Sequence, residues 1–152
     1  MAGAMLVTRV GGVACAIPIA HVVETMRPLP IEPIGAANDG ALAAVNGVAM
    51  VRGAPVPVVD ARKLIGVPGE AATRFVIVRT AERRVALVVD AVLDVRRVAA
   101  DALPGLPPLL RTAPREVVSA IGALDAELLI VLDSARVLSE DAWRALERGG
   151  KP

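Results

Sequence analysis

Short apolar runs rich in valine alternate along this chain with turn residues and single charges. At the centre, residues 47–51 and 54–59 are two such runs joined by Arg52-Gly53. β-Branched residues in runs of this length favour strands, and the intervening pair predicts a tight hairpin with Arg52 at its tip. Pro55 and Pro57 cannot donate to a ladder, so we expect the second strand to keep one edge free or to pair only through its other residues.

The same pattern predicts three more strand pairs and leaves one segment undecided. Gly11-Gly12 fits a two-residue turn, and residues 80–84 form a longer polar turn. Residues 21–27 fit either a strand or a single helical turn, whereas the prolines in 29–33 require an extended chain. The predicted pairs are 5–10 with 13–19, 75–78 with 85–89, and 117–124 with 128–132, and residues 92–98 continue the apolar pattern.

Three aspartates, Asp60, Asp90 and Asp133, each stop an apolar run. We interpret them as architectural groups whose carboxylates accept backbone hydrogen bonds where the chain turns away. Asp60 is expected to cap a short helix over residues 62–65, and Asp133 is expected to cap a turn over residues 134–138.

The chain is predicted to form a single domain over residues 1–148. Its last element is a helix with Ser139 as N-cap, closed by Arg148-Gly149, which leaves residues 149–152 as a frayed tail. The predicted connections are a loop entering a helical turn at 34–44, a linker at 69–73, and an irregular crossing segment at 103–114, which contains four prolines.

Composition excludes several classes of function. With 55% hydrophobic but only 1% aromatic residues, the interior of this 152-residue chain must be built from aliphatic side chains. A net charge of +1 gives no field to attract nucleic acid, and few aromatic residues are present to stack on bases. The chain has no charge-free apolar window of about 18 residues and no export signal, so we expect no direct membrane insertion. The single Cys15 excludes an intrachain disulfide and is consistent with a reducing cytoplasm.

Residues that could carry catalysis are sparse. His21 is the only histidine, so neither a multi-histidine metal site nor a Ser-His-Asp arrangement is easily assembled, and no phosphate-binding glycine motif is present. Asp90 and Asp94 form the best carboxylate pair, but in a strand they would lie ~13 Å apart, too far for joint acid–base work. We therefore expect a protein-binding chain without catalysis, metal or cofactor, and keep a small carboxylate-dependent enzyme as the alternative.

Most of the chain takes part in a resemblance that depends on the order and spacing of otherwise generic strands. The segments are AIPI at 16–19, VVE at 22–24, GVAMVRG at 47–53, PVVDAR at 57–62, TRFVIV at 73–78, LVVDAVLDV at 87–95, IG at 121–122 and LIVLD at 129–133. In this order they resemble the CheW-like coupling proteins of bacterial chemosensory systems.

The resemblance implies a mostly β fold of two SH3-like, five-stranded β-barrel subdomains, interleaved over a shared hydrophobic core, with short helices and a C-terminal helix. It also implies a cytoplasmic, non-catalytic adaptor in a chemosensory array. Proteins of this family couple the cytoplasmic tip of a methyl-accepting chemotaxis receptor to the regulatory domain of a CheA-type histidine kinase. That domain is similar in fold to the adaptor, which lets the two pack side by side.

Five positions carry over from the family as candidate binding residues. The receptor-contacting positions correspond to Val22, to Arg52 at the hairpin tip, and to Phe75 and Val89 near a groove between the barrels. Glu24 matches a position linked to partner binding, either of receptor or of kinase. A partner helix would place its apolar face in the groove while Arg52 pairs with a carboxylate or caps backbone carbonyls.

The chain also departs from the family pattern. Met50 stands where the family usually has asparagine, which removes a polar anchor of the hairpin, and the loop at 34–44 is longer than usual. The strands lack the usual aromatic residues. These departures support a close alternative: a divergent accessory adaptor that binds only the receptor or only the kinase, in a non-flagellar chemosensory pathway.

Overall fold

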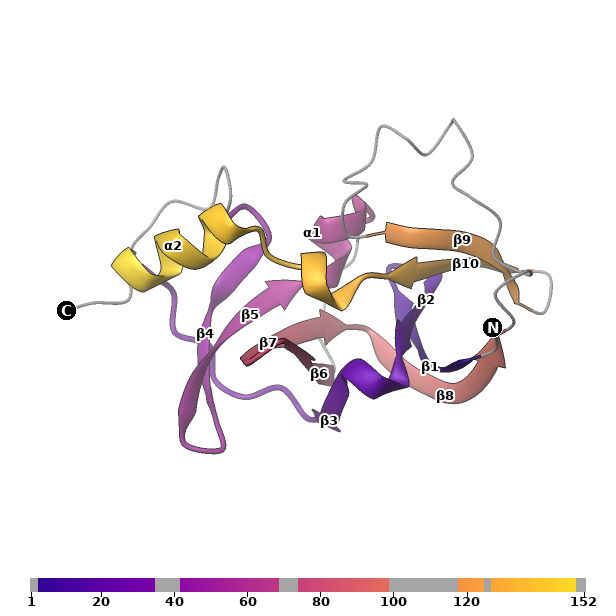
Figure 1. The fold of residues 1–152 in the computed structure, drawn as a ribbon, viewed down its shortest axis with the longest axis horizontal. Helices are drawn as coiled ribbons and strands as arrows, with labels where there is room; N and C mark the ends of the chain where they lie inside the picture. Colours follow the sequence, from indigo (N-terminus) through magenta and orange to yellow (C-terminus); the bar gives the residue numbers. More distant parts are fainter. Residues whose placement is uncertain (1–2, 35–41, 69–73, 99–117, 125–126, 150–152) are drawn as a thin grey trace.

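The structure, a computed structural model, describes residues 3–34, 42–68, 74–98, 118–124 and 127–149. Most of these residues lie in β-strands, which form two five-stranded sheets placed side by side along the long axis of the molecule (Figure 1). The predicted linker at 69–73, the irregular segment at 103–114, most of the loop at 34–44 and the tail after Gly149 lie outside the described residues.

The first sheet joins strands from both ends of the chain. In spatial order it contains β8 (Ala91–Val98), β1 (Gly3–Val10), β2 (Val13–Pro18), β10 (Glu127–Leu132) and β9 (Val118–Leu124). β1 and β2 form the predicted hairpin across Gly11-Gly12, and β9 and β10 form the predicted last pair. β2 runs parallel to β10, which joins the two hairpins into one sheet.

The second sheet is built from the middle of the chain. In spatial order it contains β3 (Val22–Met26), β6 (Arg74–Thr80), β7 (Arg83–Val89), β5 (Ala54–Asp60) and β4 (Val45–Val51). Both predicted hairpins, β4–β5 and β6–β7, are present, and β5 runs parallel to β7.

The prolines of β5 occupy positions where no ladder donor is required. Val48 exchanges backbone hydrogen bonds with Glu32, on the side of β4 that faces away from its register partner Pro57. Val48 and Pro57 are therefore a non-hydrogen-bonded pair of the antiparallel ladder, in which the two opposite residues exchange no backbone hydrogen bonds. Pairing of β5 with β7 covers only Val58 to Asp60, so the proline-bearing half lacks a neighbour on that side among the described strands. The prediction that β5 pairs through its other residues is confirmed.

Short helices connect and end the sheets. They are η1 (Ile19–His21), α1 (Ala61–Ile65), η5 (Ser134–Arg136) and α2 (Glu140–Gly149). The Asp60 side chain caps α1 by accepting from the backbone N–H of Arg62, and the Ser139 hydroxyl accepts from the N–H of Ala142 at the start of α2. In the undecided segment at 21–27 the strand alternative is correct, because β3 covers residues 22–26 and the 3₁₀ turn before it ends at His21.

Alternate side chains of the inner strands face different interiors, as the two-residue repeat of a strand requires. A shared core lies between the sheets and includes Ile17 of β2 and Val76 of β6. The opposite face of the second sheet encloses its own cluster, which includes Phe75 and Val88. A third cluster on the first sheet includes Val7, so each sheet has an apolar cluster of its own in addition to the core that the two sheets share.

The predicted barrels, in contrast, are not closed by strand ladders. The second sheet has β3 and β4 as its edges, and the first has β8 and β9, with no ladder between either pair of edges in the described part of the chain. A single pair of backbone bonds between Glu32 and Val48 and an ion pair between Glu24 and Arg52 link β4 to β3 and the segment that follows it. Prolines in that following segment remove the N–H groups that a longer ladder would need.

Candidate functional site

Arg52 occupies the tip of the β4–β5 hairpin, as predicted. Arg52 and Gly53 have φ angles of 52° and 81°, both in the left-handed region that a two-residue hairpin turn uses. Glycine accepts this backbone freely, whereas a residue with a long side chain rarely does. The Arg52 side chain is also 71% exposed, so neither turn geometry nor core packing explains the choice of arginine at this position.

Arg52 holds Glu24 through a two-pronged ion pair. Arg52 Nε donates to Glu24 Oε2 at 3.1 Å, and Nη2 donates to Oε1 at 2.7 Å. The hydrogen bonds from Arg52 lower the pKa of Glu24 from its ordinary value, and the positive charge of Arg84 acts in the same direction. Two residues that the resemblance singled out separately are therefore direct partners, which sequence reasoning did not anticipate.

The start of β3 also carries an exposed apolar residue, directly before Glu24 in the sequence. Val22 is half-buried against the shared core and pairs with Val78, but Glu24 pairs with Ile77, so Val23 is an extra, bulged residue. Bulges are frequent on edge strands, where they redirect side chains. Val23 is 36% exposed and thus offers an apolar contact that the prediction assigned to Val22.

Phe75 and Val89 require a correction. Both have 0% exposed surface, and they face opposite sides of the second sheet: Phe75 lies in the interior of that sheet and Val89 lies in the shared core. Neither can line an open groove in this structure. Their alternating positions along β6 and β7 account for this, since central strands of a curled sheet are covered on both faces.

A second arginine is buried near the junction of the sheets. Arg62 Nε and Nη2 donate to the two carboxylate oxygens of Asp60 at 3.1 and 3.2 Å, and these bonds raise the pKa of Arg62. Arg62 Nη1 lies 3.9 Å from Asp90 Oδ1, while Asp90 Oδ2 accepts from the backbone N–H of Gly11 at 3.0 Å. Asp60 and Asp90 therefore have the architectural role that their positions predicted, because they link α1 and the β7–β8 connection to the β1–β2 turn.

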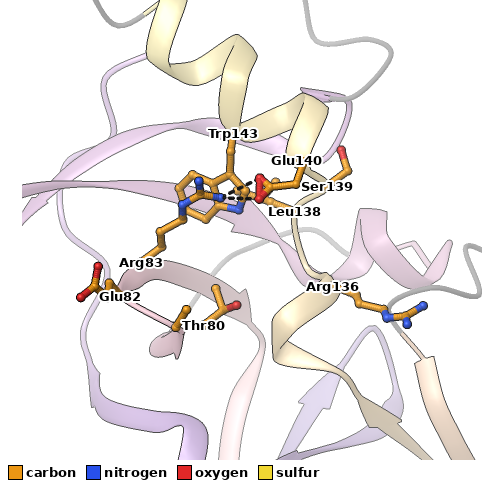
Figure 2. Close-up of a pocket in the computed structure, with 9 residues that line it drawn as sticks. Thr80, Glu82, Arg83, Arg136, Leu138, Ser139, Glu140 and Trp143 are labelled. Atoms are coloured by element: carbon orange, nitrogen blue, oxygen red, sulfur yellow. Dashed lines mark hydrogen bonds and ion pairs between the residues drawn. The ribbon is translucent and has the colours of Figure 1, made fainter.

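A cavity of about 690 Å³ lies between the β6–β7 turn and the start of α2 (Figure 2). Arg83 stacks over the ring of Trp143, with its guanidinium carbon 4.8 Å from the ring centroid, and Nη1 donates to Glu140 at 3.0 Å. The other arginine of the cavity, Arg136, pairs with Asp133. Both arginines are thus neutralised by carboxylates, and the cluster anchors α2 to the second sheet.

The described residues do not assemble a catalytic centre from the groups that the sequence offered. His21 Nδ1 and Ser134 Oγ lie 2.6 Å apart, a pairing that the sequence analysis missed, but Ser134 is only 1% exposed and cannot meet a substrate. Burial raises the pKa of Cys15 to about 12, so its thiol stays protonated. Within these residues no group of three or more potential metal-binding side chains occurs, and no helix is long and apolar enough to cross a membrane.

Comparison with known proteins identifies the class. A model of the CheW-like domain family matches residues 4–142, so this chain belongs to that family. The resemblance inferred from the segment order is confirmed. CheW-family scaffold proteins are not catalysts, and membership therefore supports the prediction that the chain is not an enzyme.

Three particular proteins show how far the similarity extends. The chain is 29% identical over 110 residues to the chemotaxis protein CheW of Klebsiella aerogenes, covering 70% of this chain and 66% of that protein. It is 34% identical over 98 residues to the chemotaxis protein CheA of Cereibacter sphaeroides, covering 61% of this chain and 13% of CheA. The crystal structure of the scaffolding protein TtCheW from Thermoanaerobacter tengcongensis superposes with a TM-score of 0.75 at 23% identity, covering 88% of this chain and 90% of TtCheW, which establishes the fold.

Proposed function

We propose that this chain is a cytoplasmic, non-catalytic adaptor that couples the tip of a methyl-accepting chemotaxis receptor to the regulatory domain of a CheA-type histidine kinase. The observation that carries the proposal is the exposed ion pair of Arg52 and Glu24 at the open edge of the second sheet. It presents a guanidinium and a carboxylate beside the exposed Val23, and it unites two of the residues that the family resemblance marks for partner binding.

Receptor binding would proceed by exchange of ionic partners. Arg52 is already held by Glu24, so a carboxylate on a receptor helix must take over one or both of its N–H donors. This exchange is inexpensive because exposed ion pairs contribute little to stability and water can solvate the released Glu24. An apolar side chain of the same helix would cover Val23, and Val22 would support that contact from below.

Kinase binding is supported by a different observation. The match to CheA covers 13% of that protein, so CheA contains a segment similar to this chain. Two domains of like fold can associate through corresponding surfaces, and we propose this mode for the kinase regulatory domain. The alternative is an accessory adaptor that binds only one of the two partners in a non-flagellar pathway; the exposed Met50 at the altered hairpin position favours it.

Sedimentation of mixtures tests the proposal directly. We expect this chain to bind a receptor-tip fragment, to bind a CheA regulatory domain, and to bring both into one complex when all three are mixed. Binding to a single partner would replace the coupling function with the accessory adaptor. Failure to bind either partner at concentrations where a known CheW does would overturn the proposed function.

A further inference from the structure

The outer face of the β4–β5 hairpin is apolar and partly uncovered. Alternate residues such as Ala49 and Val51 point into the second sheet, so their neighbours lie on the opposite face. On that face Met50 is 60% exposed, the highest exposed fraction among the large apolar side chains of the described residues. Its register partner is Pro55, and Val48 pairs with Pro57, so four apolar side chains form one continuous surface.

This surface forms the floor of a groove whose wall is α2. A cavity of about 570 Å³ lies between the hairpin residues and the side chains of Trp143 and Leu146. A second cavity of about 370 Å³ adjoins it around Met50 and extends to Leu29 and Pro30. Figure 1 shows α2 lying over the β4–β5 end of the molecule, far from β8 and β9. We call these two connected cavities the Met50 groove.

Beside Met50, the pairing of β4 with the segment that contains Glu32 is limited to one isolated bridge in the described part of the chain. The Glu32–Val48 pair is antiparallel, and Gly47 permits this close approach because a Cβ there would collide with the Glu32 carbonyl oxygen. Pro30 precedes Glu32 by two residues and lines the second cavity together with Met50. Because Pro30 has no N–H, it cannot donate to the Met50 carbonyl. The ladder therefore stops where the second cavity opens.

The charged residues among the described lining of the groove are all acidic. Glu32 and Glu147 line it, and both are exposed, whereas no lysine or arginine is among its described lining residues. An apolar floor with carboxylates at its rim complements an apolar segment flanked by cations. The same rim repels an acidic segment.

We propose that the Met50 groove binds a short segment of another protein that carries apolar side chains flanked by lysine or arginine. This surface lies on the outer face of the hairpin and differs in charge from the Arg52–Glu24 face, so the inference goes beyond the proposed function. The apolar side chains contact Met50 and Trp143, and the cations pair with Glu32 and Glu147. The groove is thus a second docking site with its own specificity.

Trp143 makes the groove directly observable, because it is the only tryptophan of the chain and lines the cavity. The probe is a synthetic amphipathic peptide of leucine and lysine without tryptophan, and the control peptide has glutamate in place of every lysine. We expect saturable change of Trp143 emission with the lysine peptide and binding at least about tenfold weaker with the glutamate peptide, since two rim carboxylates change from attraction to repulsion.

Matched variants locate the binding. Met50→Asn should lower the affinity for the lysine peptide by about fivefold or more. The double variant Glu32→Gln/Glu147→Gln should also lower this affinity and should make it less dependent on salt concentration. Leu93→Asn, an equally polar change at an exposed leucine on β8, should leave this binding unchanged.

Three results would overturn the inference. Equal binding of the lysine and glutamate peptides would show unspecific apolar adsorption. Unchanged affinity in Met50→Asn would place the peptide elsewhere. Concentration-dependent dimers of the chain alone, abolished by Met50→Asn in sedimentation equilibrium, would identify a second copy as the occupant.

Discussion

Arg52 and Arg62 each hold a carboxylate through two side-chain nitrogens, but the Arg52 side chain is 71% exposed and the Arg62 side chain is 8% exposed. Around Arg62 the dielectric is low, so removal of one partner leaves a charge that water cannot solvate. Around Arg52 the charges are screened and exchangeable. The same chemistry therefore has two settings: the Arg62 cluster links elements of the two sheets in the interior, and the Arg52 pair lies at the surface in contact with solvent.

Introducing an unpaired charge into the interior gives the largest expected effect. Val58 is fully buried in the inner strand β5, so Val58→Asp should cost more than about 4 kcal/mol and abolish cooperative thermal unfolding. Met50→Asp, on the exposed face of the neighbouring strand, is the control and should melt like the parent. A normal melting curve for Val58→Asp would show that the hairpin is not part of the core.

Arg62→Ala tests the buried half of the comparison. It leaves Asp60, which is 6% exposed, without its cation, and should lower the free energy of unfolding by about 3 kcal/mol in urea titration. Lys63→Ala removes a positive charge from the next, exposed residue and should change stability by less than about 0.5 kcal/mol. Equal effects of the two variants would mean that the buried Arg62–Asp60 pair contributes no more to stability than an exposed positive charge.

Cys15 tests how strongly the shared core disfavours charge. Its pKa is raised to about 12 by burial, whereas in the unfolded chain it has its ordinary value of 9.0. The protonated thiol therefore stabilises the fold fully below pH 9, and this contribution is lost between pH 9 and 12. At pH 10.5 the loss should be about 2 kcal/mol in urea titration. The chain contains no tyrosine to titrate in this window, and Cys15→Ala should remove most of the slope. If the free energy of unfolding fell with pH as steeply in Cys15→Ala as in the parent protein, Cys15 would not be the group that titrates.

Glu24→Gln tests the exposed half and should have the smallest effect on stability. Arg52 lowers the pKa of Glu24, so the ion pair contributes at neutral pH and is lost as the pH falls through the folded-state pKa of Glu24. Because the site is exposed, the melting temperature at pH 7 should change by less than about 2 °C. A larger drop in the melting temperature would show that this ion pair stabilises the open edge of the second sheet.

The sequence predicted the local elements well because their signals are local. Valine runs, the Arg52-Gly53 turn and the Asp60 cap depend on neighbouring residues, and each is present in the structure. The two parallel pairings, β2 with β10 and β5 with β7, join segments far apart in the chain and left no such signal.

The candidate site was predictable only in part. Arg52 and Glu24 were found through the family resemblance, but their pairing depends on the curl of the second sheet. The burial of Phe75 and Val89 was missed because a valine-rich run reads the same whether one or both faces of its sheet are covered. The exposure of Val23 depends on a bulge, and two consecutive valines give no hint of which one is extra.

The central claim is that Arg52 is a binding residue and not a structural one, and one matched pair of variants tests it. Arg52→Glu and Arg144→Glu make the same charge change at side chains that are 71% and 68% exposed, and Arg144 lies on α2 in a surface ion pair with Asp141.

Titration calorimetry with a receptor-tip fragment, on samples whose melting curves match the parent, is the measurement. We expect Arg52→Glu to weaken receptor binding by about tenfold or more and Arg144→Glu to leave it within about twofold, since only the former loses a charge-assisted contact. Equal receptor affinity of the Arg52→Glu variant and the parent protein would contradict the account.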